Sequence, residues 1–136
     1  MKAPQSTRHT RSAFTLLEMT VVILVLLSLV KIGLFTSAKM DEWKLGRAAS
    51  ETLRSVYAAQ RMYLADNPTV SVANLTTTLI IPYLPSNVTV MPTVKSLSGS
   101  TLSILVNVSP PIINSGSGVA YDPSGSNKDS LWDVGE

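Results

Sequence analysis

A run of 22 residues from Phe14 to Phe35, FTLLEMTVVILVLLSLVKIGLF, constrains the fold of this chain more than any other feature. As an α-helix it would be about 33 Å long at about 1.5 Å per residue, enough to cross a bilayer core of about 30 Å. Because its centre is apolar on all sides, this helix needs lipid or a tightly packed bundle around it. The sequence therefore predicts a transmembrane or filament-core helix over residues 14–35.

Two charged residues interrupt this run. Lys31 lies near the far end of the predicted helix, where a long side chain can reach the membrane interface. Glu18 lies one turn after Phe14, where an isolated carboxylate costs several kcal/mol unless it is paired or neutralised. Glu18 is therefore a candidate functional residue.

The positive charge of the chain is concentrated before the apolar run. Residues 1–13 contain Lys2, Arg8 and Arg11 and no acid, so they carry +3, whereas the whole chain carries +2 and the remainder therefore −1. Positive residues beside an apolar helix mark its cytoplasmic side. Residues 1–13 are predicted to be a basic cytoplasmic leader, and no nucleic-acid partner is indicated.

Residues 36–66 show the pattern of an amphipathic helix that continues into an exported domain. Apolar residues recur there at spacings of three, four and seven, with charged residues between them. These apolar positions are Trp43, Ala49, Leu53, Val56, Tyr57, Tyr63 and Leu64. We interpret Trp43 as an interfacial or core aromatic residue.

Nothing in the sequence breaks the helix between its apolar and amphipathic halves. No proline lies between residues 5 and 67, so one helix is predicted from Phe14 to about Ala65. The segment Asp66-Asn67-Pro68 supplies its stop. Gly33 and Gly46 are its weak points, because each costs about 1 kcal/mol relative to alanine.

Residues 67–136 are rich in β-branched residues, serine, proline and glycine, and they predict a small exported β-rich domain. The strand-like runs are Val88–Val94, Thr101–Val108, Val119–Tyr121 and Leu131–Val134. Pro92 limits the first run to an edge strand or a broken strand. The predicted fold class is α+β, with one long N-terminal helix packed against a small C-terminal antiparallel sheet.

The segment Arg11-Ser12-Ala13-Phe14-Thr15-Leu16-Leu17-Glu18 resembles the class III signal of type IV prepilins and type II secretion pseudopilins. Those families have a short basic leader, a small residue before the cleavage site, and Phe-Thr-Leu-[Ile/Leu]-Glu at the start of an apolar helix. The resemblance covers about the first quarter of the chain, and the helix-then-sheet layout agrees with it. It implies a type IV pilin-like fold.

The resemblance also implies roles for individual residues. A prepilin peptidase would cut between Ala13 and Phe14 and then N-methylate the new amine of Phe14. Glu18 would become the fifth residue of the mature chain and would face the N-terminal amine of its own or a neighbouring subunit during assembly. Pairing a buried carboxylate with a buried ammonium removes most of the cost that each has alone, and it favours one axial register.

Partners and location follow from the same resemblance. The partners would be the peptidase, identical or homologous pilin-like subunits and an inner-membrane assembly platform. The chain would cross the bacterial inner membrane once with its N-terminus in the cytoplasm. Its exported domain would lie in the periplasm or in an extracellular filament.

The sequence departs from the family pattern at three places. Ala13 stands where glycine is usual, and Phe35 stands where many pilins have a helix-kinking proline. The C-terminal cysteine pair of many major pilins is absent, because the chain has no cysteine. The absence of cysteines and the short predicted sheet favour a pseudopilin of a type II secretion system. A minor pilin or a competence pilin remains the alternative, and the secreted cargo and the organism are left open.

A turn-rich loop near the C-terminus is a candidate calcium site. Its oxygen ligands would be Asp122, Asn127, Asp129 and Asp133, and major pseudopilins hold calcium in their C-terminal loops. Calcium requires several oxygens that converge at about 2.3–2.6 Å, which spacing along the chain does not establish. A calcium site and a plain solvated turn are therefore both open, and no other cofactor is predicted.

Other classes of protein explain less of the sequence. In a conventional secreted protein, signal peptidase would cut after Ala38 and release a soluble binding domain, but Glu18 would then be an unexplained charge. An uncut single-pass membrane protein is a further alternative. An enzyme is not predicted, because there is no cysteine, the one histidine is His9 in the leader, and no glycine-rich phosphate loop is present.

Overall fold

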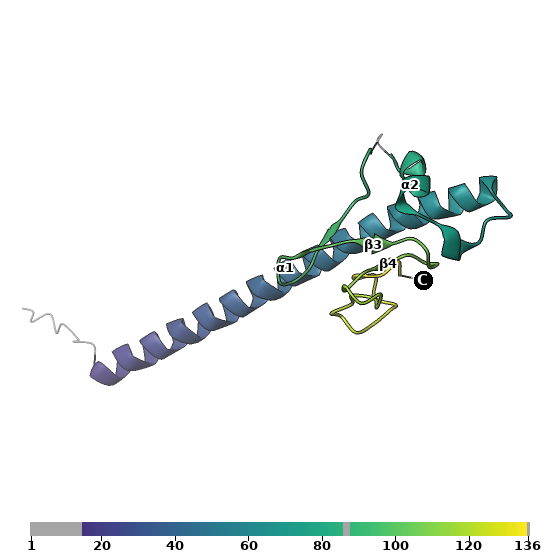
Figure 1. Ribbon diagram of the computed structural model, residues 1–136. Coiled ribbons are helices and arrows are strands. Elements are labelled where there is room, and N and C mark those ends of the chain that lie inside the picture. Colours follow the sequence, from purple (N-terminus) through teal and green to yellow (C-terminus); the bar gives the residue numbers. More distant parts are fainter. Residues whose placement is uncertain (1–14, 86–87, 136) are drawn as a thin grey trace, which may run out of the picture. The chain divides into compact units, whose positions relative to one another are not determined.

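The computed structural model describes residues 15–85 and 88–135. Its elements in order are α1 (Leu16–Asp66), η1 (Val72–Asn74), α2 (Thr77–Ile80), η2 (Ile81–Tyr83), β1 (Val94–Lys95), β2 (Thr101–Leu102), β3 (Ile104–Leu105) and β4 (Ile112–Ile113). The chain divides into two compact units, Met1–Ala38 and Lys39–Glu136, which we call the N-terminal and C-terminal units. The predicted α+β class is confirmed: one long N-terminal helix is followed by short antiparallel strand pairs (Figure 1).

Helix α1 has nearly the bounds that the sequence predicts. At its C-terminal end the backbone N and the side-chain Nδ2 of Asn67 both donate to the carbonyl oxygen of Tyr63, at 2.9 and 3.0 Å. Pro68 follows and cannot donate a further helical hydrogen bond. The Tyr83 hydroxyl donates to Asp66 Oδ2 at 2.9 Å, and this hydrogen bond raises the pKa of Tyr83 above its ordinary value.

One face of α1 forms the core of the C-terminal unit. Its buried residues are Gly46, Ala49, Ser50, Leu53, Val56, Ala59 and Gln60. Each of these positions lies three or four residues from another one in the set, so they share one side of the helix. Trp43 points elsewhere, because 52% of it is exposed. The core alternative for Trp43 is therefore wrong.

The strands form two separate antiparallel ladders instead of one sheet. β1 pairs with β2, and β3 pairs with β4. Figure 1 labels β3 and β4 beside each other. The run Thr101–Val108, predicted as one strand, is divided at Ser103 between β2 and β3. Of the run Val88–Val94 only Val94 is in a strand, in agreement with the position of Pro92. The run Val119–Tyr121 is reduced to one bridge from Ala120 to Asn114.

The predicted strand Leu131–Val134 is wrong, because this segment hydrogen-bonds to α1. Trp132 N donates to the Gly46 carbonyl oxygen at 3.2 Å, Ser50 Oγ donates to the Asp133 carbonyl oxygen at 2.6 Å, and Arg54 Nε donates to the Val134 carbonyl oxygen at 2.9 Å. The three helix residues are spaced by four and share one face of α1. The backbone of this segment therefore finds its partners on a helix and not on a neighbouring strand.

Gly46 allows the close approach of this segment to α1. A Cβ atom on Gly46 would lie 2.9 Å from Trp132 Nε1 and 3.3 Å from Leu131 Cβ. Any larger residue would therefore push the segment away from the helix. Gly46, a weak point of the helix by propensity, is required by the packing of the C-terminal unit.

Gln60 connects α1 to the loop after β3. Its side chain is fully buried, and its Nε2 donates to the carbonyl oxygens of Val106 at 2.8 Å and Val108 at 2.7 Å. Buried carbonyl groups need such partners, because leaving them without one is costly. Gln60 thus positions the chain between β3 and β4.

Candidate functional site

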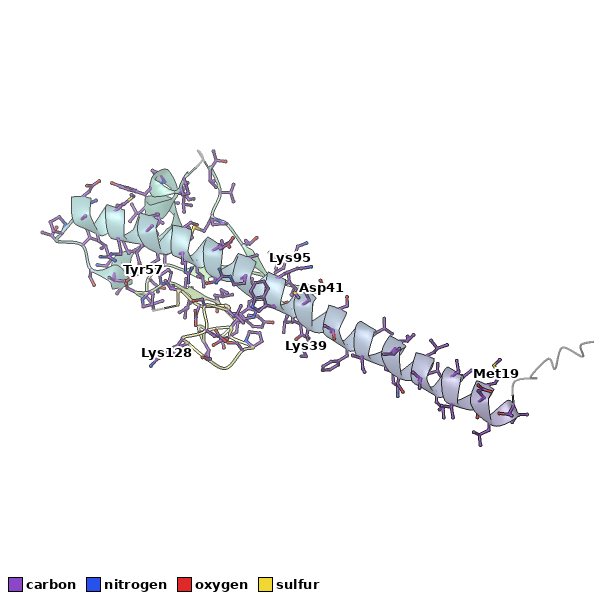
Figure 2. The ribbon with its side chains drawn as sticks, turned by 180° about the vertical axis from the view of Figure 1, so that it is seen from behind. Met19, Lys39, Asp41, Tyr57, Lys95 and Lys128 are labelled. Carbon is purple, nitrogen blue, oxygen red and sulfur yellow. The ribbon has the colours of Figure 1, made fainter. Side chains whose placement is uncertain are left out.

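The N-terminal half of α1 presents a continuous apolar surface. Every residue from 15 to 38 is exposed in the single chain, including Leu16 at 83%, Leu24 at 64% and Phe35 at 68%. Figure 2 shows the side chains of this half, Met19 among them, directed away from the helix axis into open space. By length and composition α1 could cross a membrane, a criterion that signal sequences also meet.

Glu18 lies in the first turn of α1, at the start of this apolar surface. Its backbone N donates to Thr15 Oγ1 at 3.2 Å. Thr15 immediately precedes α1, so Thr15 and Glu18 have the spacing of a capping box. The carboxylate also lies where the helix dipole favours negative charge. Glu18 therefore has a local structural role that the sequence analysis overlooked, although Thr-x-x-Glu is the usual signal for it.

The remaining processing residues can be placed only in part. Ala13 and Phe14 lie outside the described residues, so cleavage between them and methylation of Phe14 stay predictions. Lys31 is exposed on α1, four residues before Phe35. This position agrees with a long side chain reaching the end of an apolar helix.

The C-terminal loop brings together three of the four predicted calcium ligands. Asp122, Asn127 and Asp133 line one cavity of about 350 Å³, whose other walls are mainly apolar residues around β4 and the C-terminal segment. Asp129 is not among the residues that line it. Asp129 Oδ1 instead accepts a hydrogen bond from Leu131 N at 3.0 Å.

The oxygen atoms at this cavity fall short of a calcium site. Asp122 Oδ1 already accepts hydrogen bonds from Ser124 N at 3.0 Å and Ser124 Oγ at 2.6 Å. Calcium takes six to eight oxygens, and the described residues contain no group of three or more acidic, histidine or cysteine side chains that could hold a metal. Calcium binding therefore stays a prediction.

Asp133 is the unusual residue of this cavity. Both of its carboxylate oxygens are shielded from solvent and have no hydrogen-bond partner among the described residues. Burial, with the negative charges of Asp129 and Asp122, raises the pKa of Asp133 above its ordinary value. The Arg54 guanidinium and the Gly135 backbone oppose this increase in the pKa of Asp133. The folded chain thus favours protonation of this carboxyl group more than the unfolded chain does.

A second cavity lies at the start of the C-terminal unit and was not anticipated from sequence. It is an apolar groove of about 190 Å³, lined by Lys39, Glu42, Trp43, Leu97, Pro123, Ser124, Leu131 and Trp132. The available signal was Trp43, a large aromatic residue among charged positions of the amphipathic helix. Its loop neighbours could not be identified without the tertiary structure.

Comparisons with protein-family models, with characterised proteins and with solved structures found no match for this chain.

Proposed function

We propose that this chain is a structural subunit of a type IV pilin-like filament, and that it is a pseudopilin of a type II secretion system. A minor pilin or a competence pilin is the second candidate. The role is structural and not enzymatic. The observation that carries the proposal is the exposed apolar half of α1 with one carboxylate, Glu18, at its start.

The apolar half of α1 requires a partner outside the chain. Burial of apolar surface stabilises by about 25 cal/mol per Å², so a helix exposed on all sides is unfavourable in water. Lipid can cover it while the subunit is in the membrane, and helices of neighbouring subunits can cover it in a filament. A chain that moves from one environment to the other needs this all-round apolar surface.

Glu18 supports the filament class over a simple membrane anchor. A carboxylate in an apolar environment needs a positive partner, and the described part of α1 gives it none in the single chain. After cleavage, the amine of Phe14 on a neighbouring subunit would supply that partner. Such pairing would fix the axial register between adjacent helices.

The proposed path runs from membrane to filament. The basic leader keeps the N-terminus in the cytoplasm, and residues 14–35 cross the inner membrane. Prepilin peptidase exposes Phe14, and the assembly platform passes the subunit to the growing filament. The C-terminal unit is then on the exported side, in the periplasm or on an extracellular filament.

The test is the N-terminal sequence and intact mass of the chain after co-expression with a prepilin peptidase. A mature chain that begins at Phe14 with a methylated amine is the expected result. A chain that begins at Lys39 would indicate a conventional secreted protein that signal peptidase cuts after Ala38. A chain that still begins at Met1 would make it an uncut membrane protein.

A further inference from the structure

Three arginines form a row along α1 within the C-terminal unit. Arg47, Arg54 and Arg61 lie seven residues apart, so they follow one another at about 10.5 Å and at nearly the same angle around the helix axis. Arg54 and Arg61 are exposed, and Arg47 is half-buried. Charged residues at every seventh position are typical of a helix that packs against another helix.

Each of these arginines is held in place by a neighbour. The guanidinium groups of Arg47 and Arg61 lie 5.9 and 5.7 Å from the centroids of the aromatic rings four residues before them, Trp43 and Tyr57. Both distances are within the range of a cation–π contact. Arg54 Nε donates to a carbonyl oxygen of the C-terminal segment at 2.9 Å. These contacts leave the outer N–H groups of each guanidinium available for a carboxylate.

The row carries positive charge that the chain does not neutralise by contact. In the part of the chain that the structure describes, Lys39 and Lys44 each pair with an acid three residues away, whereas none of the three arginines has a carboxylate at ion-pair distance. Glu51 shares their side of α1, so three cations and one acid leave a net charge of +2. The charge of Arg54 also acts on the Asp133 carboxyl group, without an ion pair between them.

A seam of mostly small residues runs along α1 beside the arginines. Its positions are spaced alternately by three and four residues, as the facing positions of a coiled coil are. The seam consists of Ala48, Glu51, Ser55, Ala58, Met62 and Ala65. Ser55 is half-buried, and the other five residues are exposed. Because four of the six are alanine or serine, the axis of a second helix could come close to that of α1.

The core of the C-terminal unit lies on the opposite side of α1 from this seam. Ala49, Ser50 and Leu53 are buried there, at positions that a coiled coil turns to its outside. The seam is therefore not used by the core of the described residues. The arginines flank the seam, where charged residues determine which helix can pair and in which orientation.

The spacing of the arginines selects the kind of partner. Acids at every seventh residue of an α-helix recur on one side at the same interval of about 10.5 Å. In a β-strand, residues on one face recur at about 6.7 Å, so an interval of about 10 Å falls on the opposite face. The phosphates of one DNA strand return to the same side of the duplex only about every 34 Å. The row is therefore best matched by an acidic helix.

A second copy of α1 does not carry the matching acids. In the described residues of α1, the acids are Glu18, Asp41, Glu42, Glu51 and Asp66. No two of them are seven or fourteen residues apart. The helix that fits the row therefore belongs to a different chain.

We propose that the face of α1 from Arg47 to Ala65 binds an acidic helix of another protein, in which Asp or Glu recurs at every seventh residue beside a seam of small or apolar residues. Each arginine would bind one carboxylate of that helix through its outer N–H groups. Because an α-helix drifts by about 20° per heptad, the two helices would wrap left-handed and cross at about 20°. This inference concerns the C-terminal unit and does not depend on the filament role.

The test measures binding of a fluorescently labelled synthetic helix to the full chain in detergent micelles, by fluorescence anisotropy. The probe has roughly four heptads, alanine and leucine at its seam, and glutamate at both flanking positions of each heptad. The control probe has the same composition, with the glutamates moved to its outer face. We expect the first probe to bind at least about tenfold more tightly than the control probe.

Two paired variants separate the row from general charge attraction. Arg47→Gln with Arg61→Gln removes two cations of the row and should weaken binding of the first probe by about tenfold. Lys95→Gln with Lys128→Gln removes the same charge at two exposed positions outside α1, and it should leave binding unchanged. Ala58→Phe fills the seam without a change in charge and should weaken binding by at least about tenfold. Thermal unfolding by circular dichroism checks that each variant is folded.

The comparison of the two probes needs no variant, so it decides the proposal even where a substitution disturbs folding. Equal affinity for both probes, or no binding of the first, would overturn the acidic-helix partner. Equal losses in the arginine and lysine variants would reduce the row to general charge attraction and overturn it too. A chain that sediments as a dimer, and as a monomer once Arg47 and Arg61 are replaced, would assign this face to a second copy and also rule out the acidic helix.

Discussion

Glu18 has a local role at the start of α1 and a proposed role in assembly, and two substitutions separate them. Glutamine can occupy the same capping-box position as glutamate but carries no charge. We therefore expect Glu18→Gln and Glu18→Ala to be cleaved by prepilin peptidase, and both to be impaired in filament incorporation. Incorporation is measured by cross-linking and by recovery of sheared filaments. Normal assembly of Glu18→Gln would remove the charge-pairing role.

Gln60 shows how one buried amide holds a loop that has little regular structure. Gln60→Leu would leave the carbonyl groups of Val106 and Val108 without their donor. We expect it to lower the free energy of unfolding by about 2 kcal/mol or more, measured by urea denaturation. Glu51→Leu, at an exposed position of the same helix, is the control and should change stability by less than about 0.5 kcal/mol. If Gln60→Leu and Glu51→Leu lowered the free energy of unfolding equally, the result would contradict this role of Gln60.

Asp133 makes the stability of the C-terminal unit depend on pH. The pKa of Asp133 is raised in the folded state, so the stabilising contribution of Asp133 to folding is fully present below the ordinary pKa of the side chain. This contribution is lost as the pH rises through the pKa that Asp133 has in the folded state. We expect Asp133→Asn to raise the urea midpoint at pH 7 more than at pH 4, with calcium chelated. Glu51→Gln, at an exposed acid of α1 that is not among the charges acting on Asp133, is the control. If Asp133→Asn changed the urea midpoint equally at pH 4 and pH 7, the result would contradict the unpartnered state of the Asp133 carboxyl group.

At the scale of the element, α1 gives the clearest prediction because the same substitution can be made in two environments. Gly46→Ala would force Trp132 and Leu131 away from the helix, whereas an added Cβ at Gly33 meets no atom within 4 Å. We expect Gly46→Ala to lower the free energy of unfolding by about 1–3 kcal/mol, and Gly33→Ala to cause no loss. Urea unfolding followed by tryptophan emission measures both. Equal stability of the two variants would contradict the close contact at Gly46.

The bounds of α1 could be predicted from sequence because they depend on local chemistry. An uninterrupted apolar run, the absence of proline between residues 5 and 67 and the stop at Asp66-Asn67-Pro68 act within a few residues of one another. The strands could not be predicted in the same way. Each is two residues long and depends on partners elsewhere in the chain. Leu131–Val134 shows this, because its apolar residues agree with a strand whereas its backbone partners lie on α1.

At the scale of the whole molecule, the core of the described residues belongs to the C-terminal unit. All of its buried apolar residues lie between Ala49 and Val134. We therefore expect a fragment of residues 39–136 to be folded and soluble, whereas the full chain requires detergent or lipid. Sedimentation and thermal unfolding by circular dichroism measure this. An unfolded or aggregated fragment would show that the first half of α1 is needed for folding.

The sequence alone determined the long helix, its division into an all-round apolar half and an amphipathic half, and the position of Glu18, since these follow from composition and spacing along one element. Only the tertiary structure decided which residues meet across the chain. It brings Trp132 onto Gly46, and it places the amide of Gln60 on two loop carbonyl groups. It also forms the cavity lined by Asp122, Asn127 and Asp133 and the groove lined by Trp43 and Leu97. The physical reason is that these contacts join residues tens of positions apart, and their geometry depends on how the loops close over α1.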